Sequence, residues 1–504
     1  MKKRVISLLM AIWTIGSCFL FSCDKEAVKT SQESAPPPTE TEDTSRIYDA
    51  PVRDLGGHEF RFYVKTISAV TLATHEVWAE AYNGDKINDA VYSRNLKLEE
   101  TYNCTISQST VSDGSYITKI KDPLLAGDYV CDLLFGRADY NATLMQSNLL
   151  MDLATMENMD LSKAWYDDFS MNVITFDGKV FTAIGDGATL DDRAARLLYF
   201  NKGVVAEYAP DLDLYQTVRE GKWTLDLLYE IMEGTASDLD GDGSMRVGTD
   251  RFGYIAESTA DWYHVNACGV SLSVKNADGS YLIPDSPKQE LVDAWAALRK
   301  VLANPLRDVK DSGTRFRSGL GTFFTCNAGT LLTMSAAPFE YGVLPMPKLN
   351  EDQDTYYTGV GGSSFCGYAI PVTASSDPEK HWQKNGFESG EEQSAYFLEA
   401  YSYYSMNILT PAFFDQVCLK QAVVDTDSQE MVILALKNKI VDPVVLFDWG
   451  SMKSLFSYCG NGGSNGGVGT EEYWDSFTST YESRVSAARA GMESFLDSVR
   501  NAGL

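Results

Sequence analysis

The chain has 504 residues, of which 42 are lysine or arginine and 70 are aspartate or glutamate, so its formal net charge at pH 7 is −28. A surface this acidic repels nucleic acid and anionic lipid headgroups, and we therefore expect neither as a partner. Beyond the N-terminal region roughly 450 residues remain, which is more than one hydrophobic core usually supports, so the length predicts two lobes or domains.

The first 22 residues have the layout of a bacterial export signal. Three basic residues precede an apolar stretch from Val5 to Phe21, which Ser22 and Cys23 follow. This end resembles a lipobox, so we expect residues 1–22 to be a signal peptide and Cys23 to be acylated, although a bulky Phe21 departs from the usual small residue. The alternatives are a plain signal peptide and a membrane helix, but the apolar run is shorter than the roughly 20 residues that a span needs. Residues 23–50 are rich in Pro, Thr, Ser and Glu and are predicted to be a disordered, lipid-anchored tether.

Strand-like and helical patterns alternate along the rest of the chain. Residues 58–65 alternate apolar and polar side chains as a strand does, and 85–103 carry one apolar stripe with helical spacing. The apolar run 129–135 is typical of a strand that is covered on both faces. Further strands are expected at 180–184, 197–200, 341–347 and 366–371, and further helices at 223–232, from 286 onward, and from 474 to 495. This alternation predicts an α/β architecture.

Several stretches, in this order and spacing, resemble the extracellular solute-binding lipoproteins of ABC transporters, in the sugar-binding, maltose-binding-protein-like group. They are INDAVYSRNLKLEETYNC, AGDYVCDLLFGRADY, LLYFNKGVVAE with KWTLDLLYEIM, DLDGDGSMRVGTDRFGY, YGVLPMPK, and FLEAYSYYSMNILTPAFFD with EMVILALKNKIVD. The resemblance implies a two-lobed, periplasmic-binding-protein-like class II fold with a hinge and an interlobe ligand cleft. It also implies a carbohydrate ligand, ABC transporter permease subunits as partners, and a monomer.

The same resemblance predicts how the chain divides between the lobes. We expect lobe 1 to take residues 51–186, lobe 2 to take 187–325, lobe 1 to return over 326–372, and lobe 2 with the C-terminal helices to take 373–504. The crossings are expected near Ala183–Ala188, near Phe323–Ala328 and after Ile370. Glycines at 185 and 187 and in the run 359–362 stand where bending backbone would help, although each one taken alone is as well explained by an ordinary loop.

A sugar offers apolar C–H faces and a rim of hydroxyls, so its site needs aromatic rings and planar polar groups. Trp78 and Tyr82 precede the first helix, and Arg137 and Asp139 follow the strand at 129–135. Ligands of open α/β sheets gather at the carboxyl ends of strands, so we predict that all four residues contact the ligand. The alternative for Arg137 and Asp139 is a surface ion pair.

Five more ligand contacts are predicted in the second half of the cleft. Trp262 and Tyr263 resemble the second-lobe aromatics of sugar-binding relatives, and Trp449 stands where those proteins have a late cleft aromatic. Core packing is the rival interpretation of these rings. Asp186 and Arg193 flank the first crossing and are weaker polar candidates.

The stretch from Asp238 has the D-x-D-x-D-G spacing of a calcium loop, with Asp240, Asp242 and Gly243. The twelfth position, where an EF-hand has glutamate, is Thr249, and Asp250 follows it. The sequence leaves a structural calcium site and a metal-free Asp-Gly turn equally open. No other cofactor is expected.

No pattern in the sequence predicts catalysis. The four histidines, at 58, 75, 264 and 381, show no metal-ligand spacing, and there is neither a G-x-S-x-G elbow nor a phosphate loop. The seven cysteines after Cys23 are scattered, most of them in apolar runs where a free thiol acts as a small hydrophobe. We therefore predict a lipid-anchored carbohydrate-binding protein on the extracellular face of the cytoplasmic membrane that delivers its solute to a permease. A secreted carbohydrate-active enzyme, or a binding protein for a peptide or another small solute, is the alternative.

Overall fold

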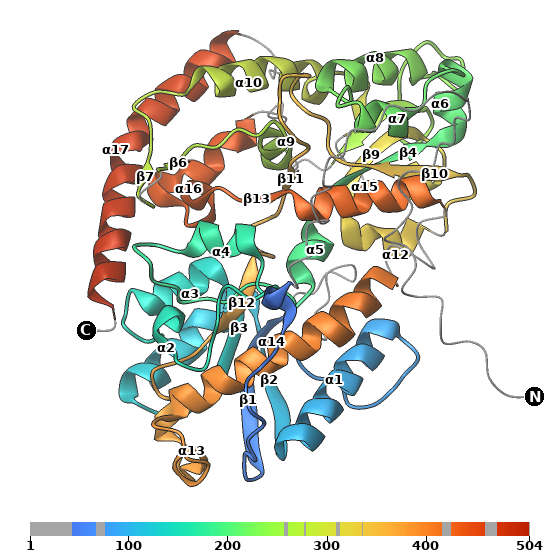
Figure 1. The fold of residues 1–504 in the computed structure, drawn as a ribbon. Helices are drawn as coiled ribbons and strands as arrows, with labels where there is room; N and C mark the ends of the chain where they lie inside the picture. Colours follow the sequence, from blue (N-terminus) through green and yellow to red (C-terminus); the bar gives the residue numbers. More distant parts are fainter. Residues whose placement is uncertain are drawn as a thin grey trace, which may run out of the picture. The chain divides into compact units, whose positions relative to one another are not determined.

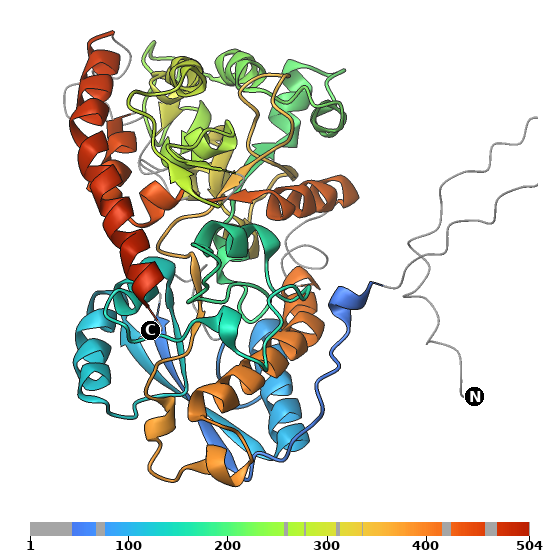
Figure 2. The same cartoon turned by 60° about the vertical axis from the view of Figure 1, so that its left-hand side comes forward.

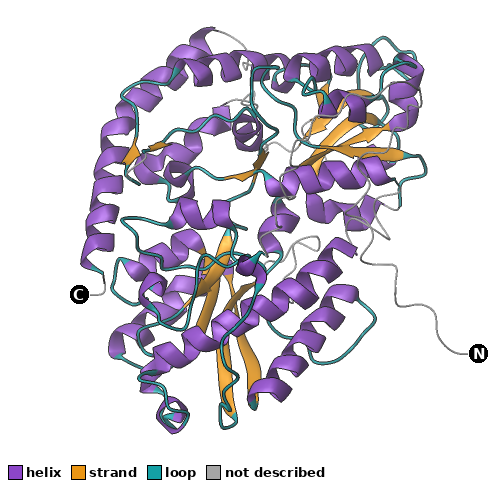
Figure 3. Cartoon of the chain, in the orientation of Figure 1, coloured by secondary structure: helices purple, strands orange, loops and turns teal. Residues whose placement is uncertain are grey.

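The computed structural model describes residues 43–66, 76–256, 261–276, 279–308, 313–334, 336–415, 425–458 and 471–502. The contacts below all lie within one unit, Ser45–Leu504. The signal segment and Cys23 lie outside the described residues. Figure 3 shows that the strands gather in two separate main sheets, each flanked by helices.

The first main sheet has the strand order β12-β3-β1-β2 (Figure 1). β1 (His58–Thr66) pairs in parallel with β2 (Cys104–Ser112) and β3 (Leu133–Arg137), and β12 (Cys366–Ala369) is antiparallel to β3. Because β1, β2 and β3 are parallel, their carboxyl ends meet at one edge of the sheet. This edge positions the charged residues of the candidate site.

The alternation in β1 buries its side chains on two faces. Phe60 stacks on Phe397 of α14 (Gly390–Phe414) with ring centroids 3.7 Å apart, and α1 (Lys86–Tyr102) packs beside α14. On the opposite face Tyr63 meets Tyr116 of α2 (Tyr116–Ala126) at 5.1 Å. This sheet, with α1, α2, α14 and α3 (Ala138–Met145), is called lobe 1 below.

The second main sheet has the order β10-β4-β9-β5-β8. β4 is antiparallel to both of its neighbours, whereas β5 is parallel to β9 and β8. Phe323 of β9 contacts Trp223 on one face and the adjacent Phe324 contacts Phe316 on the other, so the sheet is covered on both sides. This sheet and the helices packed on it are called lobe 2. Its strands are β4 (Arg196–Asn201), β5 (Phe252–Ala256), β8 (Arg307–Asp308), β9 (Gly321–Asn327) and β10 (Tyr341–Leu344).

The remaining elements are mostly short helices. Two small strand pairs complete the structure: β6 (Val274–Lys275) with β7 (Tyr281–Leu282), and β11 (Thr358–Gly359) with β13 (Lys439–Ile440). The other α-helices are α4 (Asp168–Ile174), α5 (Leu190–Ala194), α6 (Lys202–Tyr208), α7 (Leu214–Arg219), α8 (Leu225–Thr235), α9 (Asp261–Ala267), α10 (Gln289–Leu302), α11 (Thr314–Arg317), α12 (Leu331–Met334), α13 (His381–Lys384), α15 (Thr426–Lys437), α16 (Pro443–Leu446) and α17 (Glu471–Asn501). The 3-10 turns are η1 (Thr44–Arg46), η3 (Asp113–Ser115), η4 (Leu153–Thr155), η5 (Ala328–Thr330), η6 (Ala374–Ser376) and η8 (Trp449–Tyr458).

The helix α17 contacts both lobes. Near its start Phe477 packs on Trp295 of α10, with centroids 4.7 Å apart. At its other end Lys179 donates to the Ala502 carbonyl at 2.5 Å, and Arg500 pairs with Asp177 at 2.6 Å. Figure 2 shows this helix, coloured red, passing from the elements of lobe 2 to those of lobe 1.

The division of the chain between the lobes differs from the predicted boundaries. Ala183 pairs with Tyr368 of β12, and the chain then passes through α5 into β4. The predicted return at Phe323–Ala328 does not occur there, because β9 pairs with β4 and β5 and β10 still pairs with β4. The chain returns to lobe 1 only at 358–366, after β11. The expected position came from the family resemblance, and a strand that stays within a sheet has the same apolar pattern as one that crosses between lobes, so the sequence of β9 did not distinguish the two.

The C-terminal segment differs as well. Residues 373–504 were expected in lobe 2, but α13 and α14 belong to lobe 1, where α14 packs on α1. Only α15 and the later elements leave lobe 1, and α15 packs against β10.

The predicted tether also ends earlier than residue 50. The Ser45 carbonyl accepts a hydrogen bond from the Ala164 amide at 3.0 Å, and Tyr48 stacks on Tyr403 with centroids 4.9 Å apart. The five cysteines that the structure describes, at 104, 131, 268, 326 and 366, are buried and free, as hydrophobic packing of the thiols predicts. None of the described helices combines the length and apolarity that a membrane crossing requires.

Candidate functional site

Four charged side chains meet at the carboxyl edge of the lobe 1 sheet. Lys65 stands near the end of β1, Asp113 follows β2, and Arg137 ends β3. Lys65 Nζ lies 3.3 Å from one Asp113 oxygen, and Arg137 contacts the other oxygen at 3.3 Å. Arg137 also binds Asp139 in a bidentate manner, with distances of 2.8 and 2.5 Å. We call Lys65, Asp113, Arg137, Asp139 and the adjacent Tyr140 the strand-end cluster.

The strand-end cluster is held rigidly. The Lys65 side chain is buried and donates to the Ser363 carbonyl at 2.6 Å. The Arg137 guanidinium lies 4.3 Å from the centre of the Tyr140 ring. Burial by itself would lower the pKa of Arg137, but the hydrogen bonds and negative charge of Asp139 outweigh it and raise that pKa. The guanidinium is therefore a fixed cation beside an aromatic ring, and its three nitrogens already donate to Asp139, Asp113 and the Tyr140 hydroxyl.

A segment with three glycines connects this cluster to an aromatic residue of α9. Gly361 and Gly359 pack against Tyr263: a Cβ added to Gly361 would lie 2.5 Å from the Tyr263 hydroxyl. The Arg196 guanidinium lies over the same tyrosine ring, 3.9 Å from its centre. Because Ser363 receives Lys65 two residues later, the segment 359–365 lies between Tyr263 and the strand-end cluster. These glycines permit close approach of backbone to a ring.

The structure describes the side chain of Trp449 but not that of Trp262. The Trp262 backbone belongs to α9, but its side chain lies outside the described residues. Trp449 is 7% exposed, which favours the rival interpretation of core packing, and its contact with a ligand stays a prediction. Its ring stacks on Phe447 at 5.3 Å and packs on Phe495 of α17 at 5.4 Å. A kink in the backbone at Gly450 and Ser451 directly follows this residue.

Two exposed aromatic rings lie in the segment before α1, and a buried ion pair of Glu76, called the ionic anchor, holds this segment in place. Trp78 is 38% exposed and Tyr82 is 58% exposed, so both are accessible to a ligand. Two residues before Trp78, the buried Glu76 carboxylate accepts hydrogen bonds from the Thr189 amide at 2.6 Å and hydroxyl at 2.7 Å, and pairs with Arg193 at 3.1 Å. Arg193 is thus a buried partner of Glu76, and its contact with a ligand stays a prediction.

Asp186 lies in a separate hollow of about 620 Å³ beside α4, α14 and α15. The Thr410 hydroxyl donates to its carboxylate at 2.6 Å, and burial raises its pKa to about 6. The same wall carries Lys439, which contacts Asp191 at 2.5 Å, Asp192 at 2.8 Å and Asp167 at 2.9 Å. None of these contacts with Lys439 was predicted from the sequence. Their signals were the adjacent acids Asp191 and Asp192 at the first crossing, but nothing in the sequence pairs them with a lysine almost 250 residues later.

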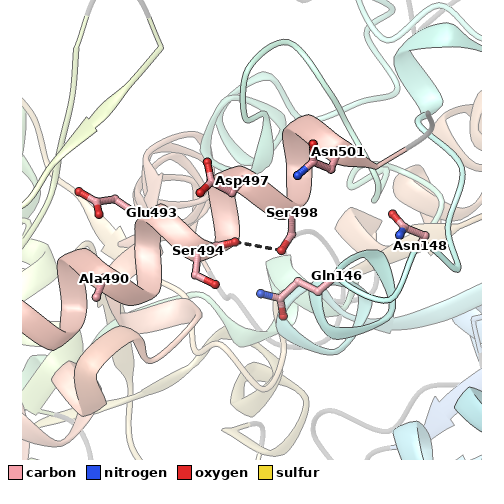
Figure 4. Close-up of a pocket in the computed structure, with 8 residues that line it drawn as sticks. All are labelled: Gln146, Asn148, Ala490, Glu493, Ser494, Asp497, Ser498 and Asn501. Carbon is pink, nitrogen blue, oxygen red and sulfur yellow. Dashed lines mark hydrogen bonds between the residues drawn. The ribbon is translucent and has the colours of Figure 1, made fainter.

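Another hollow, of about 540 Å³, lies where α17 passes the end of α3 (Figure 4). Its walls are short polar side chains without an aromatic ring, so it lacks the stacking surface that a sugar needs. The lining residues are Gln146, Asn148, Ala490, Glu493, Ser494, Asp497, Ser498 and Asn501.

The predicted calcium loop brings three of its four acids together. Ligand oxygens of Asp238, Asp240 and Asp250 lie within 4.8 Å of one another, which fits a calcium ion coordinated at 2.3–2.6 Å. Asp250 is buried and accepts amide hydrogen bonds from Leu239 and Arg246. Asp242 instead pairs with Arg246 at 2.5 Å. The residues present therefore fit a cation through three carboxylates, with Asp242 turned to the arginine.

No family model matches the sequence, and no curated protein matches it. Among solved structures, this chain is similar to a cyclic alpha-maltosyl-1,6-maltose binding protein from Arthrobacter globiformis. The match covers 88% of this chain and 99% of that protein, with 15% identity and a TM-score of 0.52. The match to an ABC substrate-binding protein from Listeria monocytogenes, in complex with cycloalternan, covers 88% of this chain and 98% of that protein, with 14% identity and a TM-score of 0.49. The match to a maltose/maltodextrin-binding domain from Bdellovibrio bacteriovorus, bound to maltotriose, covers 88% of this chain and 100% of that domain, with 13% identity and a TM-score of 0.46.

The likeness to the Arthrobacter protein shows the fold of this chain. It is the two-lobed α/β fold of periplasmic binding proteins, with one mixed sheet in each lobe. The fold class that the sequence predicted is confirmed, and so is the resemblance, as a likeness of fold.

Proposed function

We propose that this protein is the extracytoplasmic solute-binding component of an ABC importer and that it captures a carbohydrate between its lobes without transforming it. The strand-end cluster is the observation that carries the proposal. It combines a rigid bidentate Arg137–Asp139 pair, the Tyr140 ring and the buried Lys65 at the carboxyl edge of a sheet, where α/β folds bind ligands. The proteins of similar fold named above were solved with, or named for, oligosaccharides.

In this proposal the sugar contacts the strand-end cluster from lobe 1 and the α9 aromatics, Trp262 and Tyr263, from lobe 2. Trp78 and Tyr82 extend the lobe 1 wall, because both rings are exposed. The segments 186–195 and 358–366 act as hinges, since the chain passes between the lobes there. Only the closed arrangement brings both lobes into contact with the ligand, so the ligand binds this arrangement more tightly. Binding therefore shifts the protein toward closure.

The proposal places the protein outside the cytoplasm. Cleavage before Cys23 and acylation of its thiol would tether the body to the extracellular face of the membrane, next to the permease. Mass spectrometry of the N-terminal peptide from the native host would detect the acyl chains. A Cys23→Ala variant is expected in the culture medium, and its retention at the membrane would overturn the anchor.

A titration calorimetry screen tests the binding function. The panel is maltotriose, larger linear and cyclic α-glucans, and peptides of matched size, with chromatography of each mixture afterwards. We expect an oligosaccharide to bind and to be recovered intact. Recovery of hydrolysed sugar would overturn the proposal in favour of a carbohydrate-active enzyme, and binding of peptides alone would overturn the ligand class.

Variants then locate the site. Arg137→Ala should weaken binding of the sugar identified in the screen by about 1–3 kcal/mol, roughly five- to 150-fold, because it removes charged hydrogen bonds. The matched control is Arg219→Ala, which also breaks a pair of ionic contacts, to Asp427 and Glu430, but on the exposed surface of lobe 2. Equal affinities in both variants would exclude the strand-end cluster. Trp262→Ala should cost one to a few kcal/mol through the lost stacking surface, about ten- to a hundredfold.

A further inference from the structure

Three side chains that are far apart in the sequence meet at the amino end of β1, opposite the strand-end cluster. They are His58, the first residue of β1, together with Asp377, which follows η6, and His381, the first residue of α13. One ligand atom from each lies within 4.8 Å of the others. Figure 1 shows α13 beside the start of β1, and the two imidazole centroids are 5.1 Å apart.

A buried carboxylate fixes the tautomer of His58. The Nε2 atom lies 3.0 Å from one oxygen of Asp132, and the other Asp132 oxygen accepts the Arg61 amide and the Tyr129 hydroxyl, both at 2.8 Å. A carboxylate that already accepts two donors can only accept from His58, so Nε2 carries the proton. The Nδ1 atom of neutral His58 then presents a lone pair.

That lone pair points into the cluster. His58 is 3% exposed, and within the part of the chain that the structure describes its Nδ1 has no hydrogen-bond partner. The nearest charged atom is an Asp377 oxygen at 3.9 Å. An acceptor that faces a carboxylate in a buried place is unfavourable unless a cation lies between them.

Asp377 is fixed by the backbone. One of its oxygens accepts a hydrogen bond from the Glu379 amide at 3.2 Å, and the other accepts from the His381 amide at 3.3 Å. Asp377 therefore offers a negative oxygen toward both imidazoles.

His381 also contacts Asp377, and here Nδ1 lies within hydrogen-bond distance of the carboxylate. Its Nδ1 lies 3.4 Å from the same Asp377 oxygen, and its Nε2 lies 3.3 Å from a carboxylate oxygen of Glu379. Each imidazole thus has a carboxylate at Nε2 and turns Nδ1 toward Asp377. A carboxylate on the remote nitrogen is the usual support of a metal-binding histidine, because it fixes the tautomer and increases the basicity of the other nitrogen.

We propose that His58, Asp377 and His381 form a binding site for a divalent transition-metal ion of the zinc class, through two Nδ1 atoms and one carboxylate oxygen. Imidazole nitrogen with a single carboxylate is a donor set that zinc accepts, and water supplies the fourth position. Bonds of 2.0–2.1 Å in a tetrahedron separate ligand atoms by about 3.3 Å. The spacings of 3.4 Å from His381 and 3.9 Å from His58 to Asp377 are close to this.

A metal here would connect two segments more than 300 residues apart, the start of β1 and the turn before α13. Because β1 begins at this end and reaches Lys65 at the other, the ion would stabilise lobe 1 without touching the strand-end cluster. The predicted consequence is zinc-dependent stability with unchanged solute affinity.

The test uses the full chain, stripped with EDTA and dialysed. Titration calorimetry with zinc chloride should show one site per chain, and zinc should raise the melting temperature. His381→Ala should weaken zinc binding at least tenfold, and Asp132→Asn, which removes the support of His58, by about ten- to a hundredfold. His381 is the lead variant because its side chain is partly exposed, and circular dichroism is the check that the variant folds.

Asp240→Asn is the control for zinc bound by the aspartate loop, and it should retain the parent affinity. Three results would overturn the proposal. They are the absence of stoichiometric zinc binding by the parent, equal affinity in His381→Ala and the parent, and loss of binding in Asp240→Asn but not in His381→Ala.

Discussion

Replacing Asp186 by asparagine should stabilise the protein at neutral pH but not at acidic pH. The carboxylate lies in the hollow beside α14, where burial raises its pKa from 3.8 to about 6. Asparagine keeps an oxygen that accepts from the Thr410 hydroxyl, so the substitution removes the charge with little loss of packing.

The sign follows from proton linkage. Because the pKa is higher in the folded state, the folded protein binds more protons than the unfolded chain between pH 3.8 and about 6. The stability that this proton contributes is full below pH 3.8 and is lost as the pH rises through about 6. The difference between a pKa of 3.8 and one of about 6 corresponds to about 3 kcal/mol, at about 1.4 kcal/mol per pKa unit. This is the largest increase in the free energy of unfolding that Asp186→Asn can show at pH 7.5.

Urea unfolding at intervals between pH 4 and pH 8 measures the difference in free energy between variant and parent. The difference should grow from near zero at pH 4 and level off above pH 6. Asp168→Asn is the matched control, since this exposed carboxylate lines the same hollow. A difference for Asp186→Asn that stays constant across the range, or that falls with rising pH, would refute the argument from burial.

Three further predictions concern stability. Lys439→Met should lower the free energy of unfolding by about 3–5 kcal/mol at pH 7.5, because three carboxylates lose their shared cation, and by less at pH 5; an equal loss at both pH values would contradict this. Gly185→Ala should cost about 1–3 kcal/mol in urea unfolding, since its Cβ would lie 2.2 Å from the Trp165 carbonyl, whereas Gly114→Ala, with nothing within 4 Å, should be neutral. If calcium binds the aspartate loop, EGTA should lower the melting temperature of the parent but not of Asp240→Asn, and no shift in either would dismiss the site.

Where one local pattern decides the structure, the sequence predicted it well. The apolar stripe expected after Ser286 is the buried face of α10, which extends over Gln289–Leu302. The alternation of Phe60, Phe62 and Val64 in β1 is buried as expected. Arg137 and Asp139 were expected at the end of a strand, and the structure places them at the end of β3. This expectation needs only the strand to be recognised, because ligands of α/β sheets bind at strand ends.

What the sequence could not predict depends on contacts between distant segments. β2 reads CTISQSTVS, too polar to be recognised as a strand, and it forms by pairing along the whole of β1. Trp449 has polar neighbours, but its side chain is buried against Phe495. The histidines 58 and 381 have no ligand spacing because the sheet edge and a short helix bring them together only after folding.

The ionic anchor beneath Trp78 gives the protein an optical reporter of lobe movement. Glu76 is bonded to Thr189 and Arg193 at the first crossing, so rotation of that crossing displaces the backbone two residues before Trp78. The indole is 38% exposed, and its emission wavelength follows the amount of water around it. Closure on a solute should therefore shift the intrinsic emission spectrum, and Trp78→Phe should reduce that shift without abolishing capture.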